Sequence, residues 1–260
     1  MAFGWCARRI ENGAEKKDLW YHLMDEAGNE KVKPTTAIVS SDSIVAMVAG
    51  SDTTATAMAN LFWCLLVHPE TYKRLREEVD REYPHGIDPL LDTSRHANMK
   101  YLTACIHESL RVLPPVPTSG SRFITKGSGG RMIAGRFIPE GTQIFVPPYS
   151  VHSNPENFSP APDAFIPERW LEQGSKTGNS LPGGPRILKH EAFVPFSYGP
   201  ANCIGKNLAM NEMMTVGTML LQRFDFEFAD GFDRRAWRDT KLDIFVSKSG
   251  PLKVKITPRF

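Results

Sequence analysis

The feature that most limits the fold of this chain is a proline-free run from Thr35 to Val67 whose apolar residues keep helical spacing. It predicts one α-helix of more than roughly twenty residues. At about 1.5 Å per residue, such a helix is long enough to cross the middle of a large domain. The run also carries Asp42 and Asp52. We therefore interpret it as a buried helix of a soluble fold, and we expect no transmembrane element in this chain.

Two shorter helices are predicted after the long one. The first follows His68-Pro69 and has Leu75 and Val79 on its apolar side. Charged residues on its other side are expected to be exposed: Lys73, Arg74, Glu77 and Glu78. The second helix lies within residues 98–115 and stops at Pro114-Pro115. Its apolar residues recur at helical spacing: Tyr101, Leu102, Cys105, Ile106 and Leu110.

The remainder of the chain alternates short β-rich runs with Gly- and Pro-rich segments. Residues 121–148 predict a small antiparallel sheet, and the polar residues 172–190 predict a surface loop. A further helix is expected after Cys203 from apolar residues that include Ile204 and Leu208, and strands are expected in the tail. Regular β-α alternation is missing, which disfavours a doubly wound sheet. The sequence predicts a mainly α fold with small antiparallel β-sheets, as a single domain over residues 1–260.

Composition excludes several classes of protein. The chain of 260 residues is 41% hydrophobic and 23% charged, with a net charge of +2, which gives no electrostatic case for binding nucleic acid. Its four cysteines are scattered singly: Cys6, Cys64, Cys105 and Cys203. Because no C-x-x-C pair occurs, zinc-finger and thioredoxin-like sites and a disulfide framework are disfavoured. A reducing compartment suits these thiols best.

The long helix contains the segment "AGSDTT", Ala49 to Thr54. Gly50 costs about 1 kcal/mol relative to alanine inside a helix, and with Ala49 it would let a flat, bulky group approach the backbone. Thr53 can return its hydroxyl to the carbonyl three or four residues earlier. Asp52 and Thr53 could therefore relay protons to a bound ligand. The alternative is a helix–helix contact through small residues, with Asp52 in an ion pair.

Two further segments carry charged residues in apolar surroundings. In "HESLR", Glu108 and Arg111 are three residues apart and share one helix face. The simplest interpretation is a solvated pair, but "FIPERW" supplies Arg169, which could complete a buried Glu-Arg-Arg network. A network of that kind would specify the fold rather than catalyse a reaction.

The segment "FSYGPANCIGKNLA", residues 196–209, places Cys203 between Gly199 and Gly205 just before a predicted helix. The positive end of a helix dipole favours the thiolate form of cysteine, and the glycines allow tight turns and close approach of a planar partner. A thiolate can be a nucleophile, a zinc ligand or an axial haem ligand. A nucleophile needs a nearby histidine, and the sequence leaves the positions of His152 and His190 open. Zinc needs more soft ligands than this chain clusters.

Taken in order, these segments resemble the cytochrome P-450 family of haem-thiolate monooxygenases. The motif F-x-x-G-x-x-x-C-x-G at Phe196, Gly199, Cys203 and Gly205 is similar to the family's haem-binding loop. Before it come A-G-x-D-T-T, E-x-x-R and P-E-R in the family's order. The resemblance covers the chain from about Asp18 to the C-terminus and is most similar to fungal microsomal members.

The resemblance implies a role for each matching residue. Cys203 corresponds to the axial thiolate ligand, and Phe196 to the residue that packs near its sulfur. Asp52 and Thr53 correspond to the pair that delivers protons during dioxygen activation. Glu108, Arg111 and Arg169 correspond to the fold-locking network. Arg122 corresponds to a residue that pairs with a haem propionate, and Ala49, Gly50, Gly199 and Gly205 to positions close to the cofactor.

Two departures from the family's pattern stand out. The family usually has Arg or His two residues before the cysteine, where this chain has Ala201, and Asn202 could donate only a neutral hydrogen bond. Members of the family are also nearly twice as long. We therefore expect this chain to be an N-terminally truncated, C-terminal half that lacks the membrane anchor and most of the substrate site.

The resemblance implies an oxidoreductase that uses haem b to insert one oxygen atom from O₂ into a small lipophilic substrate. It also implies electrons from NADPH through a cytochrome reductase, and the cytosolic face of the endoplasmic reticulum membrane for the full-length protein. The alternative is a non-catalytic truncated fragment or pseudoenzyme that at most binds haem. A haem-thiolate isomerase or dehydratase that needs no dioxygen is disfavoured by the Asp52-Thr53 pair.

Overall fold

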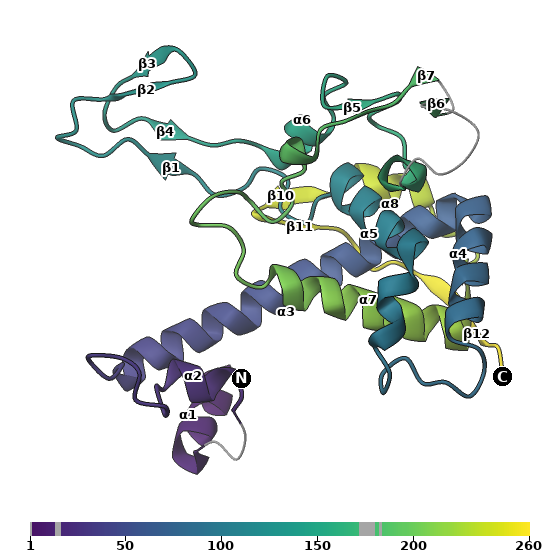
Figure 1. Cartoon of the computed structure of the whole chain (residues 1–260), viewed down its shortest axis with the longest axis horizontal. Coiled ribbons are helices and arrows are strands. Elements are labelled where there is room, and N and C mark those ends of the chain that lie inside the picture. The colour runs from purple at the N-terminus through teal and green to yellow at the C-terminus, as the bar shows by residue number, and fades with distance from the viewer. Residues whose placement is uncertain (1, 14–16, 172–179, 182–183) are drawn as a thin grey trace. The chain divides into compact units, whose positions relative to one another are not determined.

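The computed structural model describes residues 2–13, 17–171, 180–181 and 184–260 (Figure 1). The chain divides into two compact units, residues 1–53 and 54–260. Helix α3, Thr36–Val67, begins in the first unit and ends in the second, and it confirms the long proline-free helix. Among the described residues, no helix has both the length and the hydrophobicity needed to cross a bilayer.

The first unit contains two helices that the sequence did not predict, α1 (Ala2–Asn12) and α2 (Leu19–Leu23). The carboxylate of Asp18 caps α2 by accepting from the backbone N–H of Tyr21 at 2.9 Å, and it also pairs with Arg9 at 2.9 Å. A cap of this kind stabilises a helix that is too short to form by propensity alone. Periodicity is a weak guide for such short elements.

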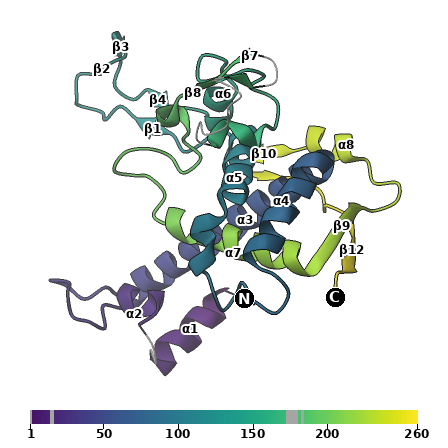
Figure 2. The ribbon, with the colours of Figure 1, turned by 45° about the vertical axis from the view of Figure 1, so that its right-hand side comes forward.

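The second unit packs helices around an apolar core. Helices α4 (Pro69–Glu82), α5 (Lys100–Val112) and α7 (Lys206–Arg223) lie side by side in Figure 2. Its fully buried apolar side chains include those predicted for the two short helices: Leu75, Val79, Leu102, Cys105 and Ile106. The helical predictions for residues 69–82 and 100–112 are confirmed.

Glu78 corrects one expectation. Its side chain was expected to be exposed, but the residue is buried. Both carboxylate oxygens accept hydrogen bonds at 2.8 Å, from the backbone N–H groups of Tyr101 and Leu102. Both N–H groups belong to the first turn of α5, where they have no acceptor within the helix, so Glu78 caps α5 from α4. Burial raises the pKa of Glu78, and the two backbone hydrogen bonds oppose that rise.

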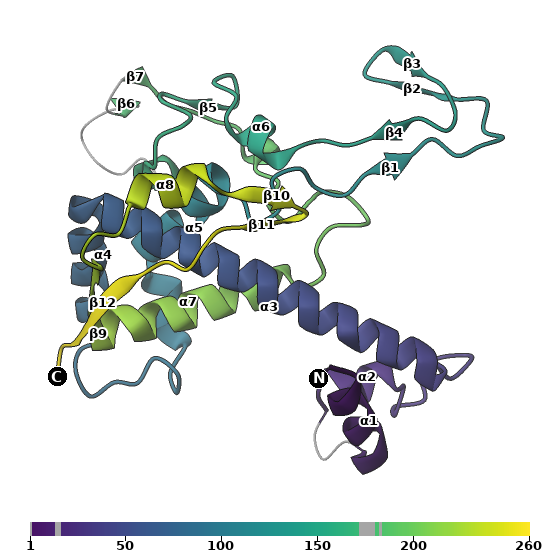
Figure 3. The same cartoon turned by 180° about the vertical axis from the view of Figure 1, so that it is seen from behind.

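The strands form two-stranded antiparallel pairs rather than one continuous sheet. The pairs are β1 (Arg122–Phe123) with β4 (Gln143–Ile144), β2 (Arg131–Ile133) with β3 (Arg136–Ile138), β5 (Phe158–Ser159) with β8 (Ile187–Leu188), β6 (Ser180–Leu181) with β7 (Gly184–Pro185), β9 (Phe224–Phe228) with β12 (Val254–Pro258), and β10 (Leu242–Ile244) with β11 (Val246–Lys248). The fold is mainly helical with small antiparallel sheets, as predicted. Figure 3 shows β9 continuing from α7 and pairing with the C-terminal strand β12.

Three segments refine the predicted outline. The loop expected over 172–190 contains β6, β7 and β8, while residues 172–179 and 182–183 lie outside the described residues. Helix α6 (Pro148–His152) and the 3₁₀ helices η1 (Ser94–Asn98), η2 (Pro167–Trp170) and η3 (His190–Ala192) were not predicted. Helix α8 (Arg234–Asp239) was also missed, and it is capped by Asp233.

Candidate functional site

The segment 196–205 folds into a closed loop at the start of α7. The backbone N–H of Cys203 donates to the carbonyl oxygen of Phe196 at 2.9 Å, and that of Asn202 donates to Gly199 at 3.1 Å. Gly199 has φ +82°, a left-handed conformation that costs other residues roughly 1–2 kcal/mol. Gly205 then caps α7. The loop therefore holds the cysteine immediately before the N-terminus of an 18-residue helix.

Cys203 is the one exposed thiol among the described cysteines, because Cys6, Cys64 and Cys105 are buried. Burial raises the pKa of the Cys64 and Cys105 thiols well above the ordinary value, so these two remain protonated. The side chains of Ile204 and Leu208, beside Cys203, are also exposed. Ile204 lies before α7 rather than within it, contrary to the prediction. The thiol is thus accompanied by apolar surface.

The second glycine of the loop, Gly205, has an ordinary φ of −82° and is not required by the backbone conformation. A Cβ atom at this position would lie 3.8 Å from the Sγ of Cys203. The missing side chain therefore leaves one side of the sulfur open. This leaves room for the expected approach of a planar partner. Gly205 also lies in a tight turn, in which the backbone N–H of Lys206 donates to the carbonyl oxygen of Cys203 at 3.3 Å.

The predicted Glu-Arg-Arg set is brought together in the second unit. The carboxylate of Glu108 accepts from Arg111 through two bonds of 2.8 Å and from the Nε of Arg169 at 3.1 Å. All three side chains have zero exposure, so the solvated alternative does not hold. Glu108 also accepts from the indole N–H of Trp170 at 2.9 Å and the backbone N–H of Ile166 at 2.9 Å. Each of the three buried charges therefore has an oppositely charged partner, while the Nη1 atom of Arg169 has no hydrogen-bond partner among the described residues.

The two arginines also donate to backbone carbonyls of the segment that runs from the last residue of α6 to η2. Arg111 donates to His152 at 2.9 Å, to Ala164 at 2.8 Å and to Pro162. Arg169 donates to Ala161 at 2.7 Å. Burial lowers the pKa of Arg169, and the Glu108 carboxylate opposes that effect. The network fastens an irregular segment to helix α5.

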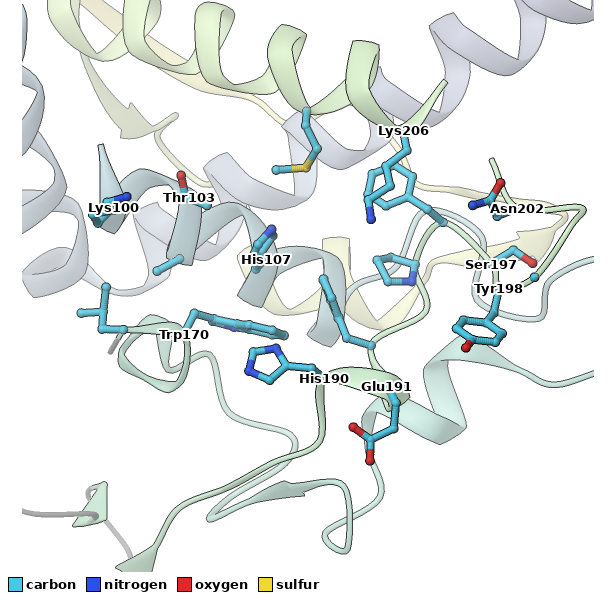
Figure 4. Close-up of a pocket in the computed structure, with 17 residues that line it drawn as sticks. Lys100, Thr103, His107, Trp170, His190, Glu191, Ser197, Tyr198, Asn202 and Lys206 are labelled. Atoms are coloured by element: carbon cyan, nitrogen blue, oxygen red, sulfur yellow. The ribbon is translucent and has the colours of Figure 1, made fainter. Parts of the chain in front are cut away.

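A cavity of about 830 Å³ lies between α5, η2 and the cysteine loop (Figure 4). His107, Trp170 and Lys206 are among the residues that line it. Burial, aided by the charges of Lys206 and His190, lowers the pKa of His107 to about 4. The imidazole is therefore neutral at pH 7. The sequence analysis missed His107, although its place directly before Glu108 puts it on the neighbouring face of the same helix.

A second cavity, of about 510 Å³, brings Arg122 of β1 near Ser197 and Tyr198 of the cysteine loop. Arg122 is exposed and, within the part of the chain that the structure describes, donates only to the backbone carbonyls of Gly120 and Ser121, at 3.4 and 3.2 Å. Among the described residues it forms no ion pair with a carboxylate. Its guanidinium is therefore available to an anionic ligand.

Four predicted site residues lie in the first unit, on α3. The hydroxyl of Thr53 donates to the carbonyl of Ala49 at 2.7 Å, which is the local bond expected for a threonine in that position. Gly50 and Asp52 are exposed, and a Cβ at Gly50 would meet no atom within 4 Å. Within the described part of its own unit, Asp52 pairs with no cation.

The donor set around Cys203 tests which metal centre fits. Among the described residues, no group of three or more His, Cys, Asp or Glu side chains could hold a metal ion. A single exposed thiol suits a metal that brings its own in-plane ligands, as the iron of haem does, and does not suit zinc. The open side of the sulfur, the apolar neighbours and the free guanidinium of Arg122 fit the faces and the carboxylates of a porphyrin. Ala201 and Asn202 are exposed and supply no cation.

Comparisons with known proteins agree with this geometry. The family model described as Cytochrome P450 matches residues 7–256. Cytochrome P450 monooxygenase nodW of Hypoxylon pulicicidum is 38% identical over 87% of this chain and 40% of its own length. Averantin hydroxylase of Dothistroma septosporum is 31% identical over 97% of this chain and 45% of its own length. Cytochrome P450 67 of Uromyces fabae is 33% identical over the same shares, 97% and 45%.

The chain thus spans less than half the length of each of these curated relatives. The family match, by contrast, extends over nearly all of its residues and includes every motif described above. This chain belongs to the cytochrome P450 family.

Proposed function

We propose that the protein acts as a haem-dependent monooxygenase that inserts one oxygen atom from O₂ into a small lipophilic substrate. The observation that carries the proposal is the placement of Cys203. It is an exposed thiol, held by a closed loop at a helix N-terminus, in a chain whose other described cysteines are buried. Membership of the P450 family supports the same chemistry.

When bound, the haem supplies the dioxygen and electron-transfer chemistry of the reaction. Cys203 would ligate its iron as a thiolate, and Gly205 would leave room for the porphyrin against the sulfur. Phe196 and Gly199 would fix the loop through the bonds described above. Arg122 would pair with one propionate, since it has no carboxylate partner among the described residues. We propose haem b as the cofactor.

On α3, Asp52 and Thr53 would move protons to the oxygen-binding side of the site. A carboxylate and a hydroxyl in adjacent positions can pass a proton between solvent and a buried ligand. Ala49 and Gly50 would let the cofactor approach the helix, because neither presents a bulky side chain. Glu108, Arg111 and Arg169 would act through the fold, by fixing the segment that leads towards the cysteine loop.

We propose the partners that the family resemblance implies. Electrons would come from NADPH through a cytochrome reductase, at the cytosolic face of the endoplasmic reticulum. Residues 1–260 would form one haem-thiolate domain in the complete enzyme. The names of the relatives support an oxygenation as the type of reaction, since one is a hydroxylase and another a monooxygenase.

A non-catalytic haem-binding role is the second candidate. It is favoured by Ala201, which leaves no cation two residues before the cysteine. One haem propionate would then have no cationic partner at this position, which would weaken binding of the cofactor.

One experiment separates the two candidates. The haem-loaded protein is incubated with microsomal reductase, NADPH, ¹⁸O-labelled dioxygen and two lipophilic probes, lauric acid and 7-ethoxycoumarin. Mass spectrometry should find one labelled oxygen atom in a product, and the yield should fall when Thr53 is replaced by alanine. Intact haem spectra without labelled product for any probe would favour the non-catalytic role.

A further inference from the structure

His152 is a buried titratable residue that the proposed function does not use. It is the last residue of α6 and has zero exposure. Its ring packs between Phe158 and Phe193, with centroids 6.0 and 5.5 Å away. The sequence left its position open, and the structure places it between the Glu108–Arg111 pair and the start of the cysteine loop.

The hydrogen bonds of His152 define its protonation state. The Nε2 atom accepts from the backbone N–H of Val194 at 3.0 Å, so it carries no proton. The Nδ1 atom lies 3.2 Å from the carbonyl oxygen of Arg111, which can only accept, so Nδ1 carries the proton. The imidazole is therefore neutral and in a single tautomer.

His152 and Arg111 hold each other through both their side chains and their backbones. The guanidinium of Arg111 donates to the backbone carbonyl of His152 at 2.9 Å, while the imidazole of His152 donates to the backbone carbonyl of Arg111. Because Arg111 is fixed in turn by Glu108, the ring has one orientation. The buried ion-pair network thereby reaches the backbone of Val194.

Val194 stands two residues before Phe196, whose carbonyl accepts from Cys203. We propose that His152 is a positioning residue that holds the entry of the cysteine loop, and through it the Cys203 thiol, in place relative to helix α5. The inference rests on the proposed function, in that the loop presents Cys203 to haem. His152 neither touches the cofactor nor takes part in the chemistry.

The surroundings of His152 keep its imidazole in the neutral form that the two hydrogen bonds require. Burial lowers the pKa of His152 to about 4; the hydrogen bond to the Arg111 carbonyl opposes this shift, and the positive charge of Arg111 adds to it. Three charged residues lie near His152: Arg111 and Glu108 from α5, and Arg169 from η2. Arg111 contacts His152 directly, whereas Glu108 is linked to it through Arg111, and Arg169 through Glu108. Protonation would place a second N–H donor against the N–H of Val194, and that contact could not persist.

Two variants of the full chain separate the effect of the His152 hydrogen bonds from the effect of the side chain's volume. H152Q keeps one donor and one acceptor, whereas H152L keeps only apolar volume. ¹⁵N spectra of histidine-labelled wild-type protein should show the Nδ1–H tautomer for His152. Hydrogen exchange at the Val194 amide should be about tenfold faster in H152L, as expected for the loss of one backbone-to-side-chain bond. In H152Q it should stay within about threefold of wild type.

The same proteins are loaded with haem, reduced and exposed to carbon monoxide. H152L should lose more of the thiolate-type Soret band than H152Q. Equal Val194 exchange in all three folded proteins, or an Nε2–H tautomer in the wild type, would overturn the positioning role. If H152L does not fold, the tautomer and the exchange rate in H152Q still decide it. A wild type with no thiolate band but with slow exchange at the Val194 amide would contradict the proposed function. It would still support the hydrogen bond by which His152 holds Val194.

Discussion

The backbone N–H of Cys203 donates to the carbonyl oxygen of Phe196 at 2.9 Å, and this bond closes the loop that carries the exposed thiol. The loop is supported from both sides. Gly205 and α7 follow it, and Val194, held by His152, precedes it. The cysteine is therefore presented by a fixed backbone rather than by a free segment.

Two glycines should respond to alanine in opposite directions. G199A forces a side chain into φ +82° and should lower the free energy of unfolding by about 1–2 kcal/mol. G50A fills open space in a helix interior and should raise it by about 0.5–1 kcal/mol. Urea unfolding of both variants and the wild type checks the pair. Equal effects would contradict the loop conformation described here.

The buried network predicts a strong asymmetry between two glutamates of neighbouring elements. E108Q removes the charge shared by Arg111 and Arg169 and should cost about 3–5 kcal/mol, because two buried guanidinium groups lose their counterion. E168Q is the matched control. Its ion-pair partner Arg74 is exposed, and the amide oxygen of glutamine can still accept from the hydroxyl of Tyr101, so E168Q should change stability by less than about 1 kcal/mol. Similar losses in chemical unfolding would argue against the network.

Glu78 gives a test of the cap on α5. E78A frees two buried backbone N–H groups and should lower stability by about 1–2 kcal/mol. The adjacent exposed residue supplies the control E77A, which should be nearly neutral. Circular dichroism during thermal unfolding compares them. A neutral E78A would mean that α5 does not need this carboxylate.

Acid should destabilise the protein through His152. Its pKa is about 4 in the folded chain, against 6.5 ordinarily, so the unfolded state binds the proton between those values. The free energy of unfolding should therefore fall as the pH drops from about 6.5 to 4, by about 3 kcal/mol for this group. Urea unfolding at pH 7 and at pH 4.5 measures the fall. It should be smaller in H152Q, and H107Q should reduce it separately because His107 also has a pKa of about 4. An unchanged fall in both variants would exclude the histidines as its source.

Periodicity and proline placement were enough to predict two of the longer helices of the second unit, α4 and α5. The runs 69–82 and 100–112 bury the apolar residues that their spacing indicated. Glu78 was wrongly predicted to be exposed, because the sequence does not distinguish a carboxylate that caps another helix from one that faces solvent. The short helices α2 and α8 were missed because they depend on the caps Asp18 and Asp233.

The candidate site was predictable as far as its motifs extend. Cys203, Glu108, Arg111 and Arg169 were found by pattern and family resemblance, and the structure brings the last three into contact. His152 and His107 could not be assigned because they matter through contacts with residues far away in the chain. His152 contacts Arg111, about 40 positions away, and His107 contacts Trp170, about 60 positions away. Spacing along the chain carries no information about such contacts.

The central claim is that Cys203 ligates haem iron as a thiolate, and the reduced carbon-monoxide spectrum tests it most directly. The haem-loaded wild type should show the long-wavelength Soret band of a thiolate ligand, and C203S should lose it. C105A, which alters a buried thiol, should keep the band if it remains folded. A wild type that binds haem without this band, or a C203S protein that retains it, would contradict the account.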